Sequence, residues 1–173
     1  MTEVWDIYDN NRIKTDRTHM RGTKMIEGDN ILIAMVLIFN TKGEMLIQQR
    51  QNHLTWLPGK WTMTAGGAVL SGETSADAAE RELFEELGIK MKFAGQRPNF
   101  AMTNETAFMD YFLVRMDIDT AYVSVPNNEA QAVKWASKDD MLTMVENGNC
   151  APYKRSFVEF CFDMGRGYGV LED

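Results

Sequence analysis

The sequence has little of several features that whole classes of protein require. Only two of its 173 residues are cysteine, Cys150 and Cys161, which are too few for a disulfide framework and have no metal-ligand spacing. The longest apolar run covers residues 31–39, whereas a membrane-spanning helix needs about 20 residues. No basic stretch followed by an apolar one, typical of a signal peptide, stands at the start. We therefore expect a reduced, cytoplasmic protein without a membrane segment.

Positive charge is also scarce, because 18 Lys and Arg residues stand against 25 Asp and Glu residues and leave a net charge of −7. General binding to nucleic acid normally needs a basic surface, so we expect no nucleic-acid partner. The hydrophobic fraction of 45% is ordinary for a globular protein. The length fits one domain, and no repeat or low-complexity linker divides the chain.

The first 28 residues are polar and rich in turn signals, and we expect them to form an extension to a main domain of residues 29–173. Apolar and polar side chains alternate over residues 4–8, which is typical of a strand. Residues 9–11 form a turn signal, and residues 12–14 are placed to return as a second strand. The extension is therefore predicted to be a β-hairpin.

The main domain is predicted to be of the mixed α/β (α+β) class, with strands on both sides of a central helix. Turn and capping signals separate its elements. We expect strands over residues 31–39 and 44–50, joined as an antiparallel hairpin, and further strands over 92–102, 107–117 and 130–136. We expect helices from Thr74 or Ser75 to Gly88, from Ser137 to Val145, and from Pro152 to about Met164.

The negative charge is concentrated in the central helix and the turn before it. Between Glu73 and Ile89 the chain has six carboxylates and one Arg, so this segment alone carries a charge of −5. At about 100° per residue, Glu82, Glu85 and Glu86 share one face of the helix, while Arg81 is directed elsewhere. Ala79, Leu83 and Leu87 form an adjacent apolar stripe that can pack on a sheet.

Two interpretations of these carboxylates compete. Charge runs are usually solvated helix faces, but here the acids converge beside a buried stripe instead of alternating with Lys. Like charges three or four residues apart destabilise a helix unless a cation lies between them. A Gly-rich turn, with Gly66, Gly67 and Gly72, precedes the helix and lets backbone approach a phosphate or a metal ion. These observations favour a site for a hard divalent cation.

Residues 67–89 match a long, gapless pattern at every defined position: G-x5-E-x7-R-E-U-x-E-E-x-G-U, where U is a bulky apolar residue. This resembles the Nudix box. The resemblance implies the Nudix fold, a mixed β-sheet sandwiched between α-helices, and a hydrolase that cleaves a diphosphate bond in a small nucleoside-diphosphate-linked or related substrate. It also implies Mg²⁺ or Mn²⁺ as the cofactor. The expected metal ions act by neutralising charge on the transferred phosphate.

The resemblance also implies roles for individual residues. Glu82, Glu85 and Glu86 are the expected catalytic and metal-binding acids, with Glu82 or a neighbour orienting or deprotonating water. Gly66 or Gly67 is expected to supply a backbone carbonyl as a metal ligand, and of the two we predict Gly66. Glu73 and Arg81 resemble the family's internal pair, which mainly holds the loop and the helix together. They are expected supporting residues, together with Gly67, which shapes the turn, and Gly88.

A second pattern is similar to the isopentenyl-diphosphate isomerase-like branch of Nudix proteins. It includes Asn40 with Gly43, Gln49 with Arg50, Pro58 to Thr62, and Thr64 to Gly67. True isomerases of that branch have a catalytic Cys and a metal-binding His where this chain has Gly66 and Ala68. Because the acid for proton transfer to carbon is missing, we favour a hydrolase over an isomerase. A non-catalytic Nudix nucleotide sensor is the other alternative.

Two further residues are expected at the substrate, Arg50 as a phosphate contact and Glu129 near the metal, with Glu105 and Asp110 as alternatives to Glu129. Residues 51–60, the N-terminal arm and residues 117–129 are expected to select the substrate. The apolar face of the C-terminal helix is expected to lie in the core or to form a homodimer interface.

Overall fold

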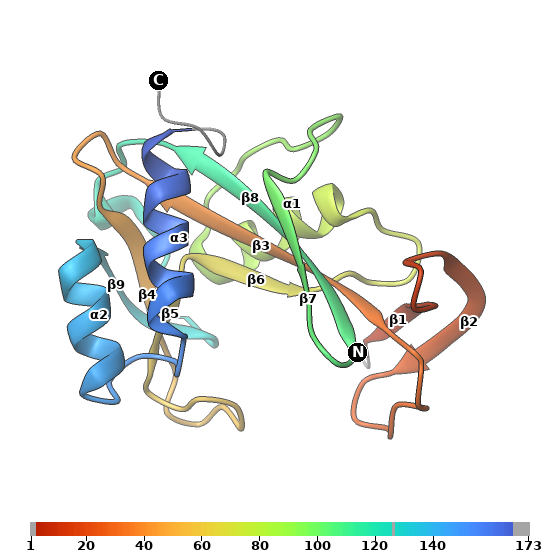
Figure 1. The fold of residues 1–173 in the computed structure, drawn as a ribbon. Coiled ribbons are helices and arrows are strands. Elements are labelled where there is room, and N and C mark those ends of the chain that lie inside the picture. The colour runs from red at the N-terminus through yellow and green to blue at the C-terminus, as the bar shows by residue number, and fades with distance from the viewer. Residues whose placement is uncertain (1–2, 126, 168–173) are drawn as a thin grey trace.

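A computed structural model describes residues 3–125 and 127–167. It contains a two-stranded sheet near the N-terminus and a seven-stranded mixed sheet that has helices on both faces (Figure 1). The expected mixed α/β class is therefore confirmed. No helix in the described part of the chain is long and apolar enough to cross a membrane.

The elements follow one another in this order. The hairpin comprises β1 (Val4–Tyr8) and β2 (Lys14–Met20). The strands before the first helix are β3 (Ile31–Phe39), β4 (Met45–Arg50), β5 (Trp61–Met63) and β6 (Ala65–Ala68). The central helix is α1 (Ser75–Leu87), and β7 (Phe100–Thr103), β8 (Ala107–Arg115) and β9 (Ala130–Ala136) follow it, with a 3-10 turn at Thr120–Tyr122. The chain ends with α2 (Lys138–Glu146) and α3 (Arg155–Arg166).

Strand β3 is the centre of the main sheet. It pairs in parallel with β8 along its whole length, from Ile31 beside Ala107 to Phe39 beside Arg115. On its other side it pairs antiparallel with β6 and, at its end, with β4. Strand β4 in turn lies between β5 and β9. The chain from β5 to β6 therefore crosses from β4 to β3, and this crossing places Gly66 and Gly67 against the middle of the sheet.

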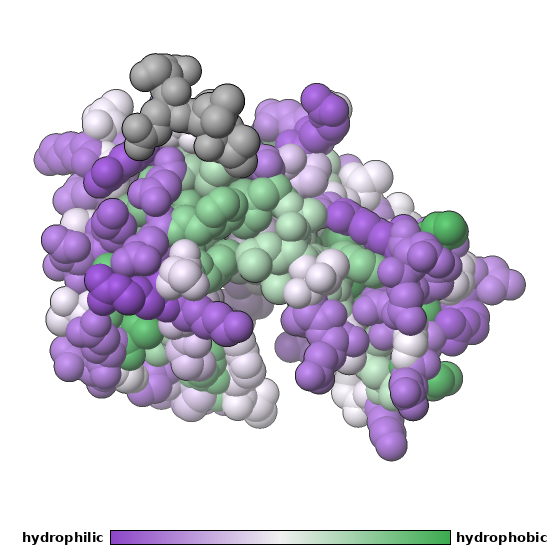
Figure 2. Space-filling view, viewed as in Figure 1, coloured by the Kyte–Doolittle hydropathy of each residue, from purple (hydrophilic) through white to green (hydrophobic). Residues whose placement is uncertain are grey.

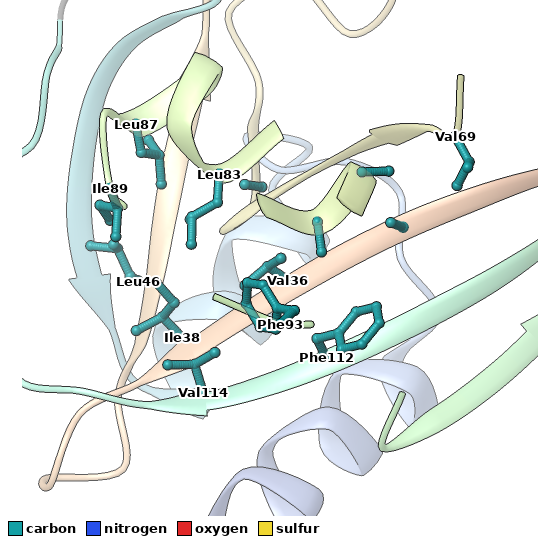
Figure 3. Packing of buried hydrophobic residues seen from close by; sticks show 14 of the residues in the cluster. Val36, Ile38, Leu46, Val69, Leu83, Leu87, Ile89, Phe93, Phe112 and Val114 are labelled. Carbon is teal, nitrogen blue, oxygen red and sulfur yellow. The ribbon is translucent and has the colours of Figure 1, made fainter. Parts of the chain in front are cut away.

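The two faces of the sheet carry separate hydrophobic cores. On one face, Leu83 and Leu87 of α1 pack with Val36, Ile38 and other strand residues (Figure 3). The expected apolar stripe on this helix is therefore confirmed. On the opposite face, Phe162 of α3 meets Phe39 edge to face, with 5.4 Å between the ring centroids.

Helix α3 covers only part of its face of the sheet. Its inward residues, such as Val158 and Cys161, are buried in the core, while the side chain of Phe160 is 38% exposed. Figure 2 shows apolar side chains gathered on this side of the molecule, between α3 and the hairpin. A homodimer interface stays a prediction.

Two sequence-based boundaries are wrong. The strand expected over 92–102 is only Phe100–Thr103, because Phe93 enters the core and its carbonyl accepts the Gln96 amide in a turn. The C-terminal helix begins at Arg155 rather than at Pro152, because the Tyr153 amide bonds back to the Ala151 carbonyl in a tight turn.

The hairpin of β1 and β2 lies at one end of the main sheet (Figure 1). Its strands are antiparallel, with Val4 opposite Met20 and Tyr8 opposite Lys14, so the expected hairpin is confirmed. A third boundary is wrong here, because the second strand is Lys14–Met20 rather than residues 12–14, and Arg12 lies in the turn with a φ of 62°. The boundary between an extension of residues 1–28 and a main domain of residues 29–173 stays a prediction.

Candidate metal-binding and catalytic site

Local signals define both ends of α1. Thr74 and Asp77 form a capping box, in which the Asp77 amide donates to the Thr74 hydroxyl and the Thr74 amide donates to the Asp77 carboxylate. At the other end, Gly88 adopts a φ of 71°, a conformation that favours glycine. A Cβ atom there would lie 2.4 Å from the Ser124 hydroxyl. The helix therefore spans the expected residues, and its acidic face is fixed in rotation.

Glu86 is a buried carboxylate at the point where α1 meets the sheet. Only 3% of the residue is exposed, and one oxygen accepts bonds from the Gln48 amide at 2.5 Å and the Gly66 N–H at 3.2 Å. Burial, followed by the charges of Glu82 and Glu129, raises its pKa to about 8. Without a cation, this site therefore holds a carboxyl group that resists ionisation.

Glu82 lies directly over Gly67. A Cβ atom on Gly67 would come within 2.3 Å of a Glu82 carboxylate oxygen, so the absence of a side chain there makes room for this acid. The Glu82 side chain is 13% exposed. Burial raises its pKa to about 6, although Arg81 acts in the opposite direction.

Arg81 does not point away from the acids, contrary to the helical-wheel expectation. Its guanidinium binds both oxygens of Glu73, at 2.8 and 3.0 Å, and reaches Glu82 at 2.6 Å and Glu85 at 3.2 Å. It also donates to the Ala68 carbonyl at 3.0 Å. Burial opposes its charge, but the bonds to Glu73 and Glu82 raise the pKa of Arg81 above its ordinary value. Arg81 thereby ties the loop before α1 to the acidic face.

The carboxylate oxygens of the site are ligands that suit a hard cation, but the side chains are not arranged as a complete set of metal ligands. Within residues 3–125 and 127–167, no three His, Cys, Asp or Glu side chains are grouped so that they could hold an ion. One reason is that Arg81 binds an oxygen of Glu82 and an oxygen of Glu85. Yet Glu82, Glu86 and Glu129 repel one another, and oxygen donors of this kind suit Mg²⁺ or Mn²⁺.

Glu129 reaches this site through the loop that precedes β9. Asn127 fixes the loop by donating to the Glu86 carbonyl at 2.7 Å and accepting from the Glu129 amide at 2.8 Å. The charge of Glu129 contributes to the raised pKa values of both Glu82 and Glu86. Of its alternatives, Asp110 is buried in an ion pair with Arg12, and Glu105 lies in the exposed turn between β7 and β8.

Arg50 is the last residue of β4, two residues after Gln48, where the pairing with β9 shifts register between Gln49 and Arg50. Its guanidinium lies over the Trp56 ring, 5.1 Å from the centroid, and its Nε donates to the Trp56 carbonyl at 2.9 Å. The Trp56 residue is 61% exposed. A cation and a flat aromatic surface are thus paired where the chain leaves β4.

Two residues that position the acids were not found by sequence analysis. Gln48 binds Glu86. The only feature of the sequence that points to Gln48 is that it is the first polar residue after three apolar ones in β4. Asn127 donates a hydrogen bond to the carbonyl of Glu86 near the end of α1. The two residues are 41 positions apart in the sequence, and no local pattern indicates this contact.

The raised pKa of Glu86 predicts how the stability of the metal-free protein depends on pH. The folded protein binds more protons than the unfolded chain between about pH 4.5 and 8, so the free energy of unfolding should fall as pH rises through this range. Thermal melts in chelator should show this fall, and Glu86→Gln should flatten it because an amide does not titrate. Parallel slopes for the two proteins would contradict the prediction.

Comparisons with known proteins agree with these observations. The model of the NUDIX domain matches residues 30–157. An uncharacterized Nudix hydrolase of Listeria monocytogenes is 37% identical over 151 residues, which cover 87% of this chain and 89% of that protein. An isopentenyl-diphosphate Delta-isomerase of Pectobacterium atrosepticum is 27% identical over 106 residues, 61% of this chain and 57% of that protein.

A solved structure has the same architecture. The protein DR0079 of Deinococcus radiodurans superposes with a TM-score of 0.76 at 22% identity, and the match covers 92% of this chain and 99% of that one. This likeness confirms the expected fold, a mixed sheet sandwiched between helices.

Proposed function

The chain belongs to the Nudix hydrolase family, in its isopentenyl-diphosphate isomerase-like branch, and from this premise we propose what it cleaves and how. The proposed substrate is a small compound in which a nucleoside diphosphate is linked to another group. The proposed reaction is hydrolysis of the diphosphate bond in the cytoplasm, with Mg²⁺ or Mn²⁺ bound.

The observation that carries this proposal is the crowding of Glu82, Glu86 and Glu129. The charge of Glu129 makes ionisation of Glu82 and Glu86 less favourable, the charge of Glu82 adds to this at Glu86, and Glu86 is almost fully buried. A protein keeps such a group when a cation offsets the repulsion. We assign Glu82, Glu85, Glu86 and the Gly66 carbonyl as the residues that would hold it. When bound, the cation would neutralise charge on the diphosphate oxygens and on the leaving group.

The remaining roles belong to side chains of this protein. Glu82 is largely buried but less so than Glu86, and we assign it to orient the attacking water and to accept its proton. Glu86 stays fixed by Gln48 and the Gly66 amide, and so it supplies a ligand whose position does not depend on solvent. Arg81, held by Glu73, keeps the acidic face and the loop in register.

The isomerase alternative is disfavoured by space as well as by chemistry. The position of the isomerase Cys is Gly66, where a Cβ atom would lie 2.5 Å from the Met35 sulfur and 2.6 Å from the Ala34 carbonyl oxygen. A thiol cannot be placed there unless β3 moves. The sensor alternative is disfavoured by the complete set of acids in residues 67–89.

A product screen tests the proposal. The protein with Mg²⁺ or Mn²⁺ should release inorganic phosphate or a phosphomonoester from at least one of four groups of compounds: nucleoside diphosphates, nucleotide sugars, dinucleotide polyphosphates and coenzymes. Isopentenyl diphosphate should yield no dimethylallyl isomer by NMR. Formation of that isomer, or no cleavage of any diphosphate despite cation binding, would contradict the proposal.

Arg50 is proposed to bind a phosphate of the substrate beside Trp56. Arg50→Ala should raise KM about tenfold with a smaller effect on kcat, because a charge-assisted hydrogen bond contributes about 1.5–3 kcal/mol. Steady-state kinetics measure this change. Arg155→Ala on α3, which removes only exposed pairs with Glu146 and Glu159, is the control and should leave KM unchanged. An unchanged KM in Arg50→Ala would remove Arg50 from the substrate site.

A further inference from the structure

We propose that the N-terminal hairpin is part of the catalytic scaffold and that Asp6 is a positioning residue, which holds the loop before α1 and, through it, the acids that would bind the cation. This inference rests on the proposed function, because it assigns a role at the same site. It concerns a segment that lies outside residues 67–89, for which the sequence suggested substrate selection but no part in holding the acids.

The first step is the contact between the hairpin and the loop of residues 69–73. Asp6 is 5% exposed, and its two oxygens accept from the Ser71 hydroxyl at 2.7 Å and the Gly72 N–H at 2.9 Å. The Ser71 N–H donates to the Val4 carbonyl at 2.8 Å. Burial acts to raise the pKa of Asp6, but bonds from Lys14, Gly72 and Ser71 outweigh it and the pKa is lowered overall. One buried carboxylate therefore secures the turn of this loop.

The second step leads from the loop to the acidic face. The Glu73 amide donates to the Leu70 carbonyl, and the Leu70 amide donates to the Glu73 carboxylate, each at 3.0 Å. Glu73 then holds Arg81 by two bonds, and Arg81 reaches Glu82 and Glu85. Hydrogen bonds and neighbouring residues of the loop thus connect Asp6 to Glu82 in a continuous series.

The third step is that the hairpin is anchored independently of the loop. Arg12 at its tip adopts a φ of 62° and binds both oxygens of Asp110 on β8, at 2.5 and 2.6 Å. Tyr8 and Asn30 exchange backbone hydrogen bonds at 2.8 and 2.9 Å. Because these anchors join the hairpin to β3 and β8, Asp6 holds the loop from a fixed position relative to the sheet.

If Asp6 only stabilised the fold, its replacement would act like that of any other buried, paired aspartate. Asp29 is such a residue and provides the matched control. Asp29 is 7% exposed and is bound by Arg17 at 2.8 and 2.5 Å, so it too is a buried aspartate paired with a cation of the hairpin. No hydrogen bond between Asp29 and residues 69–73 is found among the described residues. Asp6→Ala and Asp29→Ala should therefore both lower the melting temperature, but only Asp6→Ala should disturb the loop.

The experiment compares both variants in the full chain with Mn²⁺ as the probe. Asp6→Ala should weaken Mn²⁺ binding about tenfold in calorimetry and lower kcat more than it changes KM, as is typical of an indirect metal support. Asp29→Ala should change neither by more than about twofold. In the metal-free protein, hydrogen exchange over residues 68–73 should accelerate in Asp6→Ala only. Ser71→Ala, which removes one bond from the loop side, should show the same effects more weakly.

The outcomes separate the two proposals. If the wild-type protein binds no Mn²⁺ and cleaves no diphosphate, the proposed function fails, and hydrogen exchange still decides the role of Asp6. If Asp6→Ala binds Mn²⁺ as the wild-type protein does, or if both variants lose affinity and exchange protection equally, Asp6 is not a positioning residue. If Asp6→Ala does not fold, Ser71→Ala gives the same comparison, and unchanged binding and exchange in it would overturn the inference.

Discussion

Glu82→Gln should lower kcat by about 10²- to 10⁴-fold, the range for loss of a general base, while the fold remains intact. Glutamine has the shape of glutamate, and its carbonyl oxygen can still accept the bond from Arg81, so packing changes little. It carries no charge for a cation and cannot accept the proton of water. Removing one of several mutually repelling charges should leave the melting temperature equal or higher.

Glu80→Gln is the matched control for this variant. Glu80 lies on the same helix, but its carboxylate binds Lys92 and the amides of Phe93 and Ala94 on the outer side. The same substitution there should reduce stability slightly and leave turnover unchanged. Steady-state rates and thermal melts of the two variants, made side by side, measure both effects. Turnover retained in Glu82→Gln would contradict the catalytic assignment.

Two adjacent glycines should respond to alanine in opposite ways. The three atoms nearest to a Cβ atom on Gly67 all belong to the carboxyl group of Glu82, at the end of a flexible side chain, so Gly67→Ala should displace this acid at little cost in stability. We expect activity to fall at least about 10²-fold, as for loss of the acid itself. A Cβ atom on Gly66 meets the Ala34 carbonyl and Met35, which cannot move as easily.

Gly66→Ala should therefore destabilise the fold by about 1–3 kcal/mol, the usual range for overpacking. Denaturant melts and kcat are measured for both variants. Displacement of the acid lowers kcat with little loss of stability, whereas displacement of the sheet lowers the free energy of unfolding. An active Gly67→Ala with normal metal dependence would mean that Glu82 works from another position.

An element is predicted correctly when the residues that determine its ends are close to it in the sequence. The limits of α1 depend on Thr74, Asp77 and Gly88, which act within one helical turn, and they are correct. The strand expected over 92–102 failed because Phe93 is drawn into a core whose other members come from distant elements. Local pattern cannot show that the chain must turn there.

The candidate site divides in the same way. The spacing of Glu82, Glu85 and Glu86 on one helix was readable, since it needs only helical geometry. The resemblance implied the pair of Glu73 and Arg81, which the structure shows. The contacts of Arg81 with Glu82 and Glu85 were not readable, because they depend on how its long side chain bends. Gln48, Asn127 and Asp6 approach the site from other parts of the fold, and only tertiary structure brings them there.

The parallel pairing of β3 with β8 has a consequence for the time course of folding. Each residue of β3 pairs with the residue 76 positions later, as Ile31 does with Ala107 and Phe39 with Arg115, so the segment that contains α1 lies inside a loop that this pair must close. Contacts between residues so far apart in sequence form slowly. The chain must lose the conformational entropy of the intervening loop before it gains the free energy of strand pairing. During synthesis, the helix emerges from the ribosome before the strand that completes its sheet. The acidic face must therefore wait, without its final support, until β8 and then Asn127, which holds the end of α1, have been made.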